Sequence, residues 1–149
     1  MKLLRPYLTA VLATAALVSS QDFSGFHHDC QEIGFTGDNT VVYGMGCAAV
    51  PGGTPGGNHE SKLNINLCLS YVSSVLVAHQ GGGYTDLPSQ CHNCQQPAET
   101  YTCNCSHSGT WQLATIDLTS FIGVENGSLC CNAGSVETPS VRCGSYVSW

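Results

Sequence analysis

The stretch from Thr110 to Cys131, TWQLATIDLTSFIGVENGSLCC, has the alternation and the turn residues of antiparallel β-structure. Apolar and polar residues alternate through TIDL, and FIGV follows, a pattern that is typical of half-buried strands. The pair Asn126-Gly127 then precedes SLCC, and both residues accept a positive φ. We therefore predict that this part of the chain closes a β-hairpin with a two-residue type I′ turn at Asn126-Gly127.

The rest of the chain shows the same kind of pattern and almost no helical periodicity. Short alternating runs are separated by Gly, Asn, Ser and Pro, which favours an all-β domain. The predicted strands are Thr40–Tyr43, Ser61–Asn66, Ser74–His79, Thr100–Cys105, Gln112–Asp117 and Ser128–Cys131. Two glycine-rich stretches, 51–58 and 80–84, are predicted to be connectors.

The opening stretch has a diverged copy earlier in the chain. Moved back by 53 positions, it falls on SKLNINLCLSYVSSVLV, residues 61–77. Four aliphatic residues then coincide with aliphatic residues without a gap, namely Ile116 with Leu63, Leu118 with Ile65, Ile122 with Leu69 and Leu129 with Leu76. Val124 falls on Tyr71 and matches less well. We therefore predict a tandem of two related β units, over about 23–80 and about 85–131.

The N-terminus, MKLLRPYLTAVLATAALVSSQ, has the layout of a secretory signal peptide. Lys2 and Arg5 precede an apolar run over 8–18 that is too short to cross a bilayer, and small residues follow it. We expect cleavage after Ser20 and a freely secreted, extracellular product. The predicted organisation is a signal peptide over 1–20, one domain over 21–131 and a C-terminal tail over 132–149.

The charge of the mature chain limits its partners. All ten acidic residues lie beyond residue 20, against only Lys62 and Arg142, so the net charge is 2 − 10 = −8. Two basic residues cannot neutralise a row of phosphates. We therefore expect neither nucleic acid nor an anionic membrane as partner.

All ten cysteines also lie in the mature chain, and an even number behind a signal peptide predicts a disulfide framework in an oxidising compartment. Their number does not fix their connectivity. Cys130 and Cys131 are adjacent in a predicted strand and face opposite sides, so they cannot easily share one partner. The motif Cys91-His92-Asn93-Cys94 could indicate a redox or zinc site, but no βαβ setting and no second matching pair accompany it. We therefore expect structural disulfides there.

Four short motifs occur in the same order in each of the two units. In the second unit they are LPSQC (87–91), TYTCNC (100–105), ATIDLT (114–119) and IGVENGSL (122–129). In the first unit they are FHHDC (26–30), VVYGMGC (41–47), SKLNIN (61–66) and LSYVSSVL (69–76). In this order the motifs resemble the repeat of the cyanovirin-N homology family, over nearly all of residues 23–131. The first repeat departs from the family pattern at Ser74, which replaces the turn glycine.

The resemblance implies an all-β, disulfide-stapled, pseudo-symmetric fold with one disulfide per repeat. Those pairs would be Cys30–Cys47 and Cys91–Cys105. Six cysteines remain unassigned, so three further bridges are implied, and Cys143 is available to fasten the tail.

The resemblance also implies a lectin for oligomannose-type glycans, which acts without catalysis, cofactor or metal. Each sugar site would combine residues before the first cysteine of a repeat, residues after its second cysteine, and the hairpin tip of the other repeat. The preferred site carries hydroxyl, amide and imidazole groups, and Tyr71 is expected to pack against a sugar face. Its residues are Ser70, Tyr71, Ser73, Ser89, Gln90, Ser106 and His107. The weaker site contains His28, Asp29 and Asn126, where Ala48 and Val50 make a poor sugar surface.

Two triplets, at Asn104 and Asn126, match the N-glycosylation pattern. Asn126 is at an exposed turn and is the favoured acceptor, whereas Asn104 lies in a strand beside a predicted disulfide. A glycan on Asn126 would obstruct the weaker site.

Two alternatives stay open beside the lectin. The chain could be a small secreted interaction protein that keeps the scaffold without binding sugar, because fold does not fix function. A hydrolase using Asp117 and Glu125 has weaker support, since an acid pair in an acidic chain says little. The run His27-His28-Asp29, together with His59-Glu60, could also suggest a weak metal site, but solvated polar loops explain it better. We expect glycans or glycoproteins as partners, and a monomer or a dimer swapped through Gly81-Gly82-Gly83.

Overall fold

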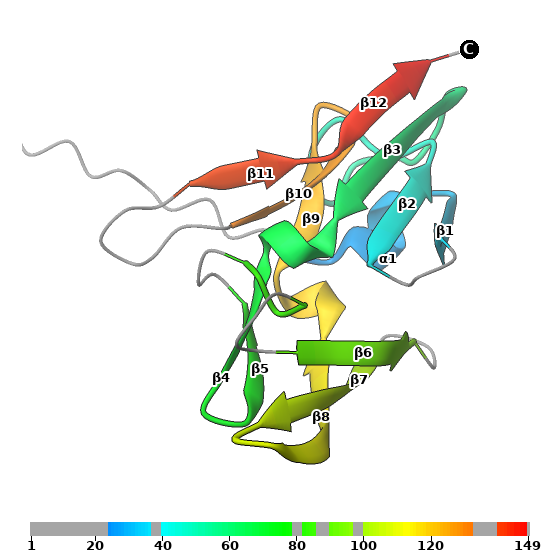
Figure 1. Ribbon diagram of the computed structural model, residues 1–149. Helices are drawn as coiled ribbons and strands as arrows, with labels where there is room; N and C mark the ends of the chain where they lie inside the picture. Colours follow the sequence, from blue (N-terminus) through cyan, green and yellow to red (C-terminus); the bar gives the residue numbers. More distant parts are fainter. Residues whose placement is uncertain are drawn as a thin grey trace, which may run out of the picture.

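The computed structural model describes residues 24–36, 40–78, 82–85, 90–96, 100–132 and 140–148. Within these ranges the chain forms antiparallel sheets, one short α-helix and two 3-10 helices, so the all-β prediction is confirmed (Figure 1). Outside them lie the predicted signal peptide, Ser89 of the preferred site, and Gly81 of the predicted hinge.

The first sheet has the order β1-β2-β3-β12 and joins the two ends of the described chain. Its strands are β1 (Glu32–Phe35), β2 (Val41–Met45), β3 (His59–Asn64) and β12 (Ser145–Ser148). The helix α1 (Phe26–Asp29) precedes β1. Part of the tail, which the repeat pattern leaves out, therefore completes this sheet as an edge strand.

The second sheet has the order β6-β7-β8. Its strands are β6 (Gln90–Gln95), β7 (Thr100–His107) and β8 (Thr110–Asp117). Along the central strand β7, Tyr101, Cys103 and Cys105 are fully buried. Because side chains alternate along a strand, Thr102, Asn104 and Ser106 lie on the opposite, outer face.

Two hairpins complete the described part of the chain, and each follows a 3-10 helix. The first is η1 (Ile65–Leu67), β4 (Leu69–Val72) and β5 (Val75–Ala78). The second is η2 (Leu118–Ser120), β9 (Ile122–Glu125) and β10 (Ser128–Asn132), and β10 also pairs with β11 (Val141–Cys143).

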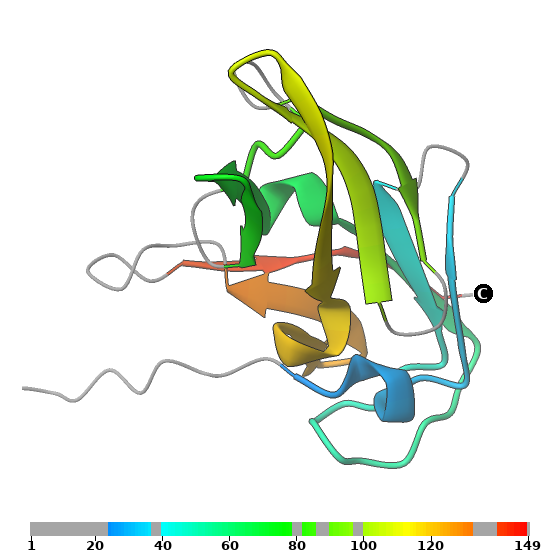
Figure 2. The same cartoon turned by 90° about the horizontal axis from the view of Figure 1, so that it is seen from below.

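Each hairpin follows a strand of one sheet in the chain but packs on the other sheet. The hairpin β9–β10 follows β8 but contacts the first sheet, where Leu129 N–H donates to the Ser61 hydroxyl at 2.9 Å. The hairpin β4–β5 follows β3 but contacts β8 of the second sheet. Figure 2 shows α1 beside η2, where Gly25 N–H donates to the Thr119 carbonyl at 2.8 Å. The segments therefore interlock across the molecule.

Five disulfides tie these segments together, and among the described residues no cysteine is free. They are Cys30–Cys47, Cys68–Cys131, Cys91–Cys105, Cys94–Cys103 and Cys130–Cys143. The first and third are the pairs that the resemblance implies, and the adjacent residues Cys130 and Cys131 bond to Cys143 and Cys68. This density of disulfides indicates an oxidising environment. No helix among the described residues is long and apolar enough to cross a membrane.

The predicted strands are found, with different ends. The strand predicted over Ser61–Asn66 begins at His59 and stops at Asn64, whose side chain accepts from Asn66 N–H at 2.9 Å and starts η1. The strand predicted from Ser74 begins at Val75, because Ser73 and Ser74 have positive φ and form the turn. The type I′ turn at Asn126-Gly127 is confirmed, with φ of 50° and 80°.

Candidate functional site

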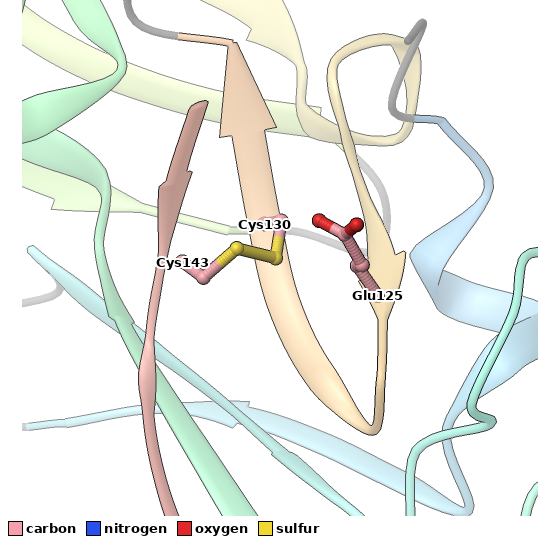
Figure 3. A group of neighbouring side chains, drawn as sticks. All are labelled: Glu125, Cys130 and Cys143. Carbon is pink, nitrogen blue, oxygen red and sulfur yellow. A yellow bond between two sulfur atoms is a disulfide. The ribbon is translucent and has the colours of Figure 1, made fainter. Parts of the chain in front are cut away.

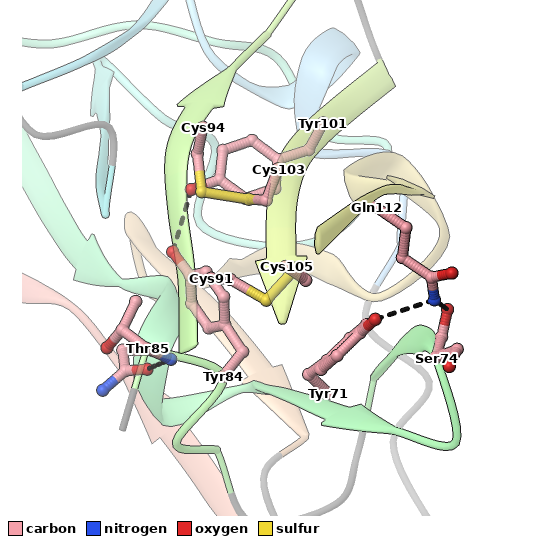
Figure 4. The surroundings of a disulfide bond; sticks show 11 residues. Tyr71, Ser74, Tyr84, Thr85, Cys91, Cys94, Tyr101, Cys103, Cys105 and Gln112 are labelled. Carbon is pink, nitrogen blue, oxygen red and sulfur yellow. Dashed lines mark hydrogen bonds between the residues drawn. A yellow bond between two sulfur atoms is a disulfide. The ribbon is translucent and has the colours of Figure 1, made fainter. Parts of the chain in front are cut away.

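The hairpin tip between β4 and β5 is fixed to β8 by one side chain. Gln112 Nε2 donates to Tyr71 Oη at 2.9 Å and to the Ser74 carbonyl at 3.2 Å (Figure 4). On the inner face of the second sheet lie the buried pair Tyr84–Tyr101, whose hydroxyls are 2.8 Å apart, and two neighbouring disulfides, Cys91–Cys105 and Cys94–Cys103. The tip is therefore held against a rigid sheet.

Two residues of the preferred site are buried in this contact. Tyr71 is only 5% exposed, so the expectation that its ring packs against a sugar face is wrong. Ser70 is also buried, and its hydroxyl donates to the Gly82 carbonyl at 2.8 Å. Both side chains support the hairpin because β4 is covered on one side by β8 and on the other by the segment at Gly82.

Other residues of the preferred site reach the surface. Gln90 of β6 lies opposite Ser106 of β7, and Ser106 lies opposite Trp111 of β8, so the three form one row across the sheet. Gln90 is exposed and Ser106 is half-buried. Ser73 is exposed at the hairpin tip, while the side chain of His107 and the whole of Ser89 lie outside the described residues.

A groove of about 570 Å³ extends from this row over the outer face of the second sheet. We call it the outer groove. Its lining comes from all three strands and consists of Asn93, Gln95, Thr102, Asn104, Trp111, Gln112 and Leu113. Four of these residues carry amides, and none carries a charge, although the whole chain has a net charge of −6. The groove therefore suits a neutral polar ligand.

Two apolar side chains of the outer groove face solvent. Trp111 is 46% exposed and Leu113 is 76% exposed. The Trp111 ring lies edge-on to His92, with ring centroids 4.4 Å apart and an interplanar angle of 90°. This contact fixes the indole while leaving part of it accessible.

Sequence reasoning missed Trp111, Gln112 and the amides of β6 and β7. The pattern TWQLATID predicts a strand, but alternation alone does not say whether Trp111 or Gln112 faces the interior. A tryptophan would ordinarily be assigned to the core. One feature of the sequence points to an outward-facing Trp111. Residues two apart in a strand share a face, so Trp111 and Leu113 lie on the same face as the polar residue Thr115.

The segments of the weaker site also meet, but its chief polar group is occupied. Asp29 is 3% exposed, and its Oδ1 accepts from Gly52 N–H at 2.8 Å. Asn126 N–H donates to the Ala49 carbonyl at 2.7 Å. His28 is exposed. Asp29 therefore holds the loop over 48–53 in place and is not available to a ligand, whereas the side chains of His28 and Asn126 stay exposed.

The described residues bring one metal-like group together, formed by Glu125, Cys130 and Cys143. Figure 3 shows that the two sulfur atoms are bonded to each other as a disulfide. Neither sulfur is then a thiolate, the form that binds metal. The His59 Nε2 atom lies 3.0 Å from the Cys47 carbonyl, and the ring is buried. Neither the group at Glu125, Cys130 and Cys143 nor the surroundings of His59 therefore offers a set of metal ligands among the described residues.

The remaining alternative motifs have structural roles. Cys91 and Cys94 of the CHNC motif bond to Cys105 and Cys103 across β6 and β7. Asp117 Oδ1 accepts from Thr119 N–H at 2.8 Å and caps η2.

The outer groove combines an accessible indole, several side-chain amides and a hydroxyl on a rigid, neutral surface. Such a surface can stack on a ring and form paired hydrogen bonds with hydroxyl groups. No protein-family model, no curated protein and no solved structure matches this chain.

Proposed function

We propose that this protein is a secreted, non-catalytic lectin that binds oligomannose-type glycans in the outer groove and along its rim. The observation that carries the proposal is the exposed indole of Trp111 beside the side-chain amides of Asn93, Gln95 and Asn104, with no charged group in the lining. Gln90 and Ser106 lie in one row with Trp111 across the sheet, and the resemblance to cyanovirin-N proteins also assigns these two residues to a sugar site.

The chemistry of a saccharide fits this lining. The apolar face of a pyranose ring stacks on the indole, and its edge carries hydroxyls that both donate and accept. Side-chain amides offer one acceptor and two donor hydrogens each, so Asn93, Gln95 and Asn104 can form paired hydrogen bonds with neighbouring hydroxyls. An analogue that lacks one of these hydroxyls leaves an amide without its hydrogen-bond partner, so the site binds that analogue more weakly.

A cyanovirin-type tandem arrangement is part of the proposal. The series of strand, 3-10 helix, hairpin strand, turn and hairpin strand occurs twice, and the second 3-10 helix starts 53 positions after the first, at Leu118 against Ile65. Asn64 and Asp117, also 53 apart, cap the two helices in the same way. This correspondence supports the proposed repeat beyond the four aliphatic matches in sequence.

The proposal includes secretion. Five disulfides need an oxidising compartment to form, and residues 1–20 have the pattern of a signal peptide.

Glycan binding can be tested with the mature chain, residues 21–149, made in an oxidising bacterial periplasm, where the usual expression hosts add no N-linked glycan. We expect saturable binding to oligomannose structures on a glycan array. In titration calorimetry, Trp111→Ala should weaken that binding about tenfold or more, because a central tryptophan typically contributes over about 1.4 kcal/mol.

Tyr146→Ala is the matched control. Tyr146 is a similarly exposed aromatic residue, 51% exposed, but it lies on β12 in the first sheet. This variant should bind glycans as the parent does. Absence of binding to every oligomannose structure would overturn the proposal. Binding to a protein that persists after that protein is deglycosylated would instead favour an interaction module, for which Leu113 would be an apolar contact.

A further inference from the structure

Asn104 is placed in the outer groove by the alternation of β7. Its neighbours Cys103 and Cys105 are fully buried in disulfides on the inner face, so Asn104 faces outward between β6 and β8. Its side chain is half-buried and lines the groove. Asn104-Cys105-Ser106 is also a triplet that accepts an N-linked glycan.

The surroundings of Asn104 can hold a saccharide. Leu113 lies opposite Asn104 in the register of β7 and β8, and Trp111 is the next outward residue of β8. These two side chains expose apolar surface on the same side of the sheet. A sugar attached to the Asn104 amide would start inside the groove, beside the indole, without crossing any other element.

We propose that Asn104 carries an N-linked oligosaccharide whose first sugars lie in the outer groove against Trp111. The amide nitrogen of Asn104 forms a bond to the anomeric carbon of a lipid diphosphate-linked oligosaccharide. The bond from that carbon to the diphosphate oxygen breaks, the lipid diphosphate leaves, and the amide nitrogen loses one proton. The modification rests on the secretory route included in the proposed function, because the lipid-linked donor belongs to that compartment.

The structure sets when this transfer occurs. In the folded sheet, residue 104 is paired on both sides, with His92 and with Leu113. Its neighbours in sequence are locked by Cys94–Cys103 and Cys91–Cys105. A transferase needs a flexible segment, so Asn104 is modified before these two disulfides close.

The attached glycan has a consequence for the proposed lectin site. Its sugars are present at high effective concentration because they are tethered at the groove itself. They therefore compete with external glycans, and the modified chain is a lectin whose site is occupied by its own saccharide. This consequence depends on the proposed function, whereas the packing of the glycan on Trp111 does not.

The packing is tested on protein secreted from a eukaryotic host that adds N-linked glycans. The chain has two tryptophans, so Trp149→Phe leaves Trp111 as the only fluorescent indole. In this background, mass spectrometry of glycopeptides should find a glycan on Asn104. Ser106→Ala removes the acceptor triplet but keeps Asn104, and acrylamide should then quench Trp111 about twofold more strongly, because an indole face is uncovered. Ser106→Thr keeps the triplet and should restore the protection.

Asn126→Gln is the control, because it removes the other acceptor triplet, which lies at the tip of β9–β10. It should leave the quenching of Trp111 unchanged. An unmodified Asn104 would overturn the proposal. So would a glycan on Asn104 with the same quenching constant in the parent and in Ser106→Ala.

Glycan binding is measured on a second pair of samples. In the Asn126→Gln background, the unmodified chain from the bacterial periplasm should bind oligomannose about tenfold or more tightly than the modified chain from the eukaryotic host, since it lacks the tethered competitor while keeping Asn104. If neither form binds glycans while the Trp111 protection is observed, the lectin function fails and the packing of the glycan stands.

Discussion

Gln112 joins the hairpin β4–β5 to the second sheet through one side-chain amide. Its nitrogen has two hydrogens, and the two acceptors, Tyr71 Oη and the Ser74 carbonyl, use both. The contact is partly buried, so a lost donor leaves these oxygens without easy access to water. At the scale of a single residue, this is the amide on which the geometry of the hairpin tip depends.

We expect Gln112→Ala to lower the free energy of unfolding by about 1–2 kcal/mol, since two partly buried hydrogen bonds are lost. Gln95→Ala is the control, because Gln95 is exposed on β6, and it should change stability by less than about 0.5 kcal/mol. Guanidinium unfolding of the oxidised protein measures both. Equal losses would contradict the role given to Gln112.

At the scale of the element, the turns of the hairpins β4–β5 and β9–β10 differ in sequence. Ser73 and Ser74 have φ of 50° and 72°, close to the 50° and 80° of Asn126 and Gly127. The backbone therefore adopts one turn shape with two different sequences. Asn and Gly accept this shape readily, whereas serine is strained at positive φ. The first hairpin keeps the shape because Gln112 and Tyr71 hold it from outside.

Glycine at the second turn position should relieve the strain in the first hairpin. We expect Ser74→Gly to raise the free energy of unfolding by about 0.5 kcal/mol or more, because the left-handed penalty exceeds the added entropy of the unfolded chain. Thermal unfolding followed by circular dichroism would show a higher Tm.

The reverse change tests the same argument in the second hairpin. A Cβ at Gly127 would lie 3.1 Å from His59 Nε2 and 3.2 Å from Tyr146 Cε2, in addition to the positive φ. Gly127→Ser should therefore lower the Tm. If both substitutions shift it in the same direction, turn strain is not the cause.

At the scale of the whole molecule, the five disulfides fall into two kinds. Four close short loops within a sheet or join neighbouring strands, with sequence separations from 9 to 17. Cys68–Cys131 spans 63 residues and joins the start of the hairpin β4–β5 to β10. It therefore crosslinks the two interlocked parts of the fold.

The long bridge should contribute most to stability. Chain entropy predicts a loss of about 4 kcal/mol for Cys68→Ala with Cys131→Ala, against about 3 kcal/mol for Cys94→Ala with Cys103→Ala. Each pair removes two sulfur atoms from the interior, so cavity effects are similar. Chemical unfolding of the two double variants measures the difference. A larger loss for the short bridge would mean that native-state packing, not chain entropy, dominates.

The candidate site could be predicted only in part. Gln90 and Ser106 reach the surface because they flank the buried Cys91 and Cys105 in register. Ser70 and Tyr71 were assigned to the same surface, but the docking of β4–β5 on β8 buries them. Trp111 could not be placed, because its exposure depends on which face of β8 the hairpin covers.

The sequence by itself determined the β-class, the turn at Asn126-Gly127 and the 53-residue correspondence. These follow from period-two alternation and from local backbone preferences, which need no distant contact. Only the tertiary structure decided the three remaining disulfides, the joining of the tail to β3, and the outer groove. Each of these depends on which faces pack together, and packing unites residues that are far apart in the chain.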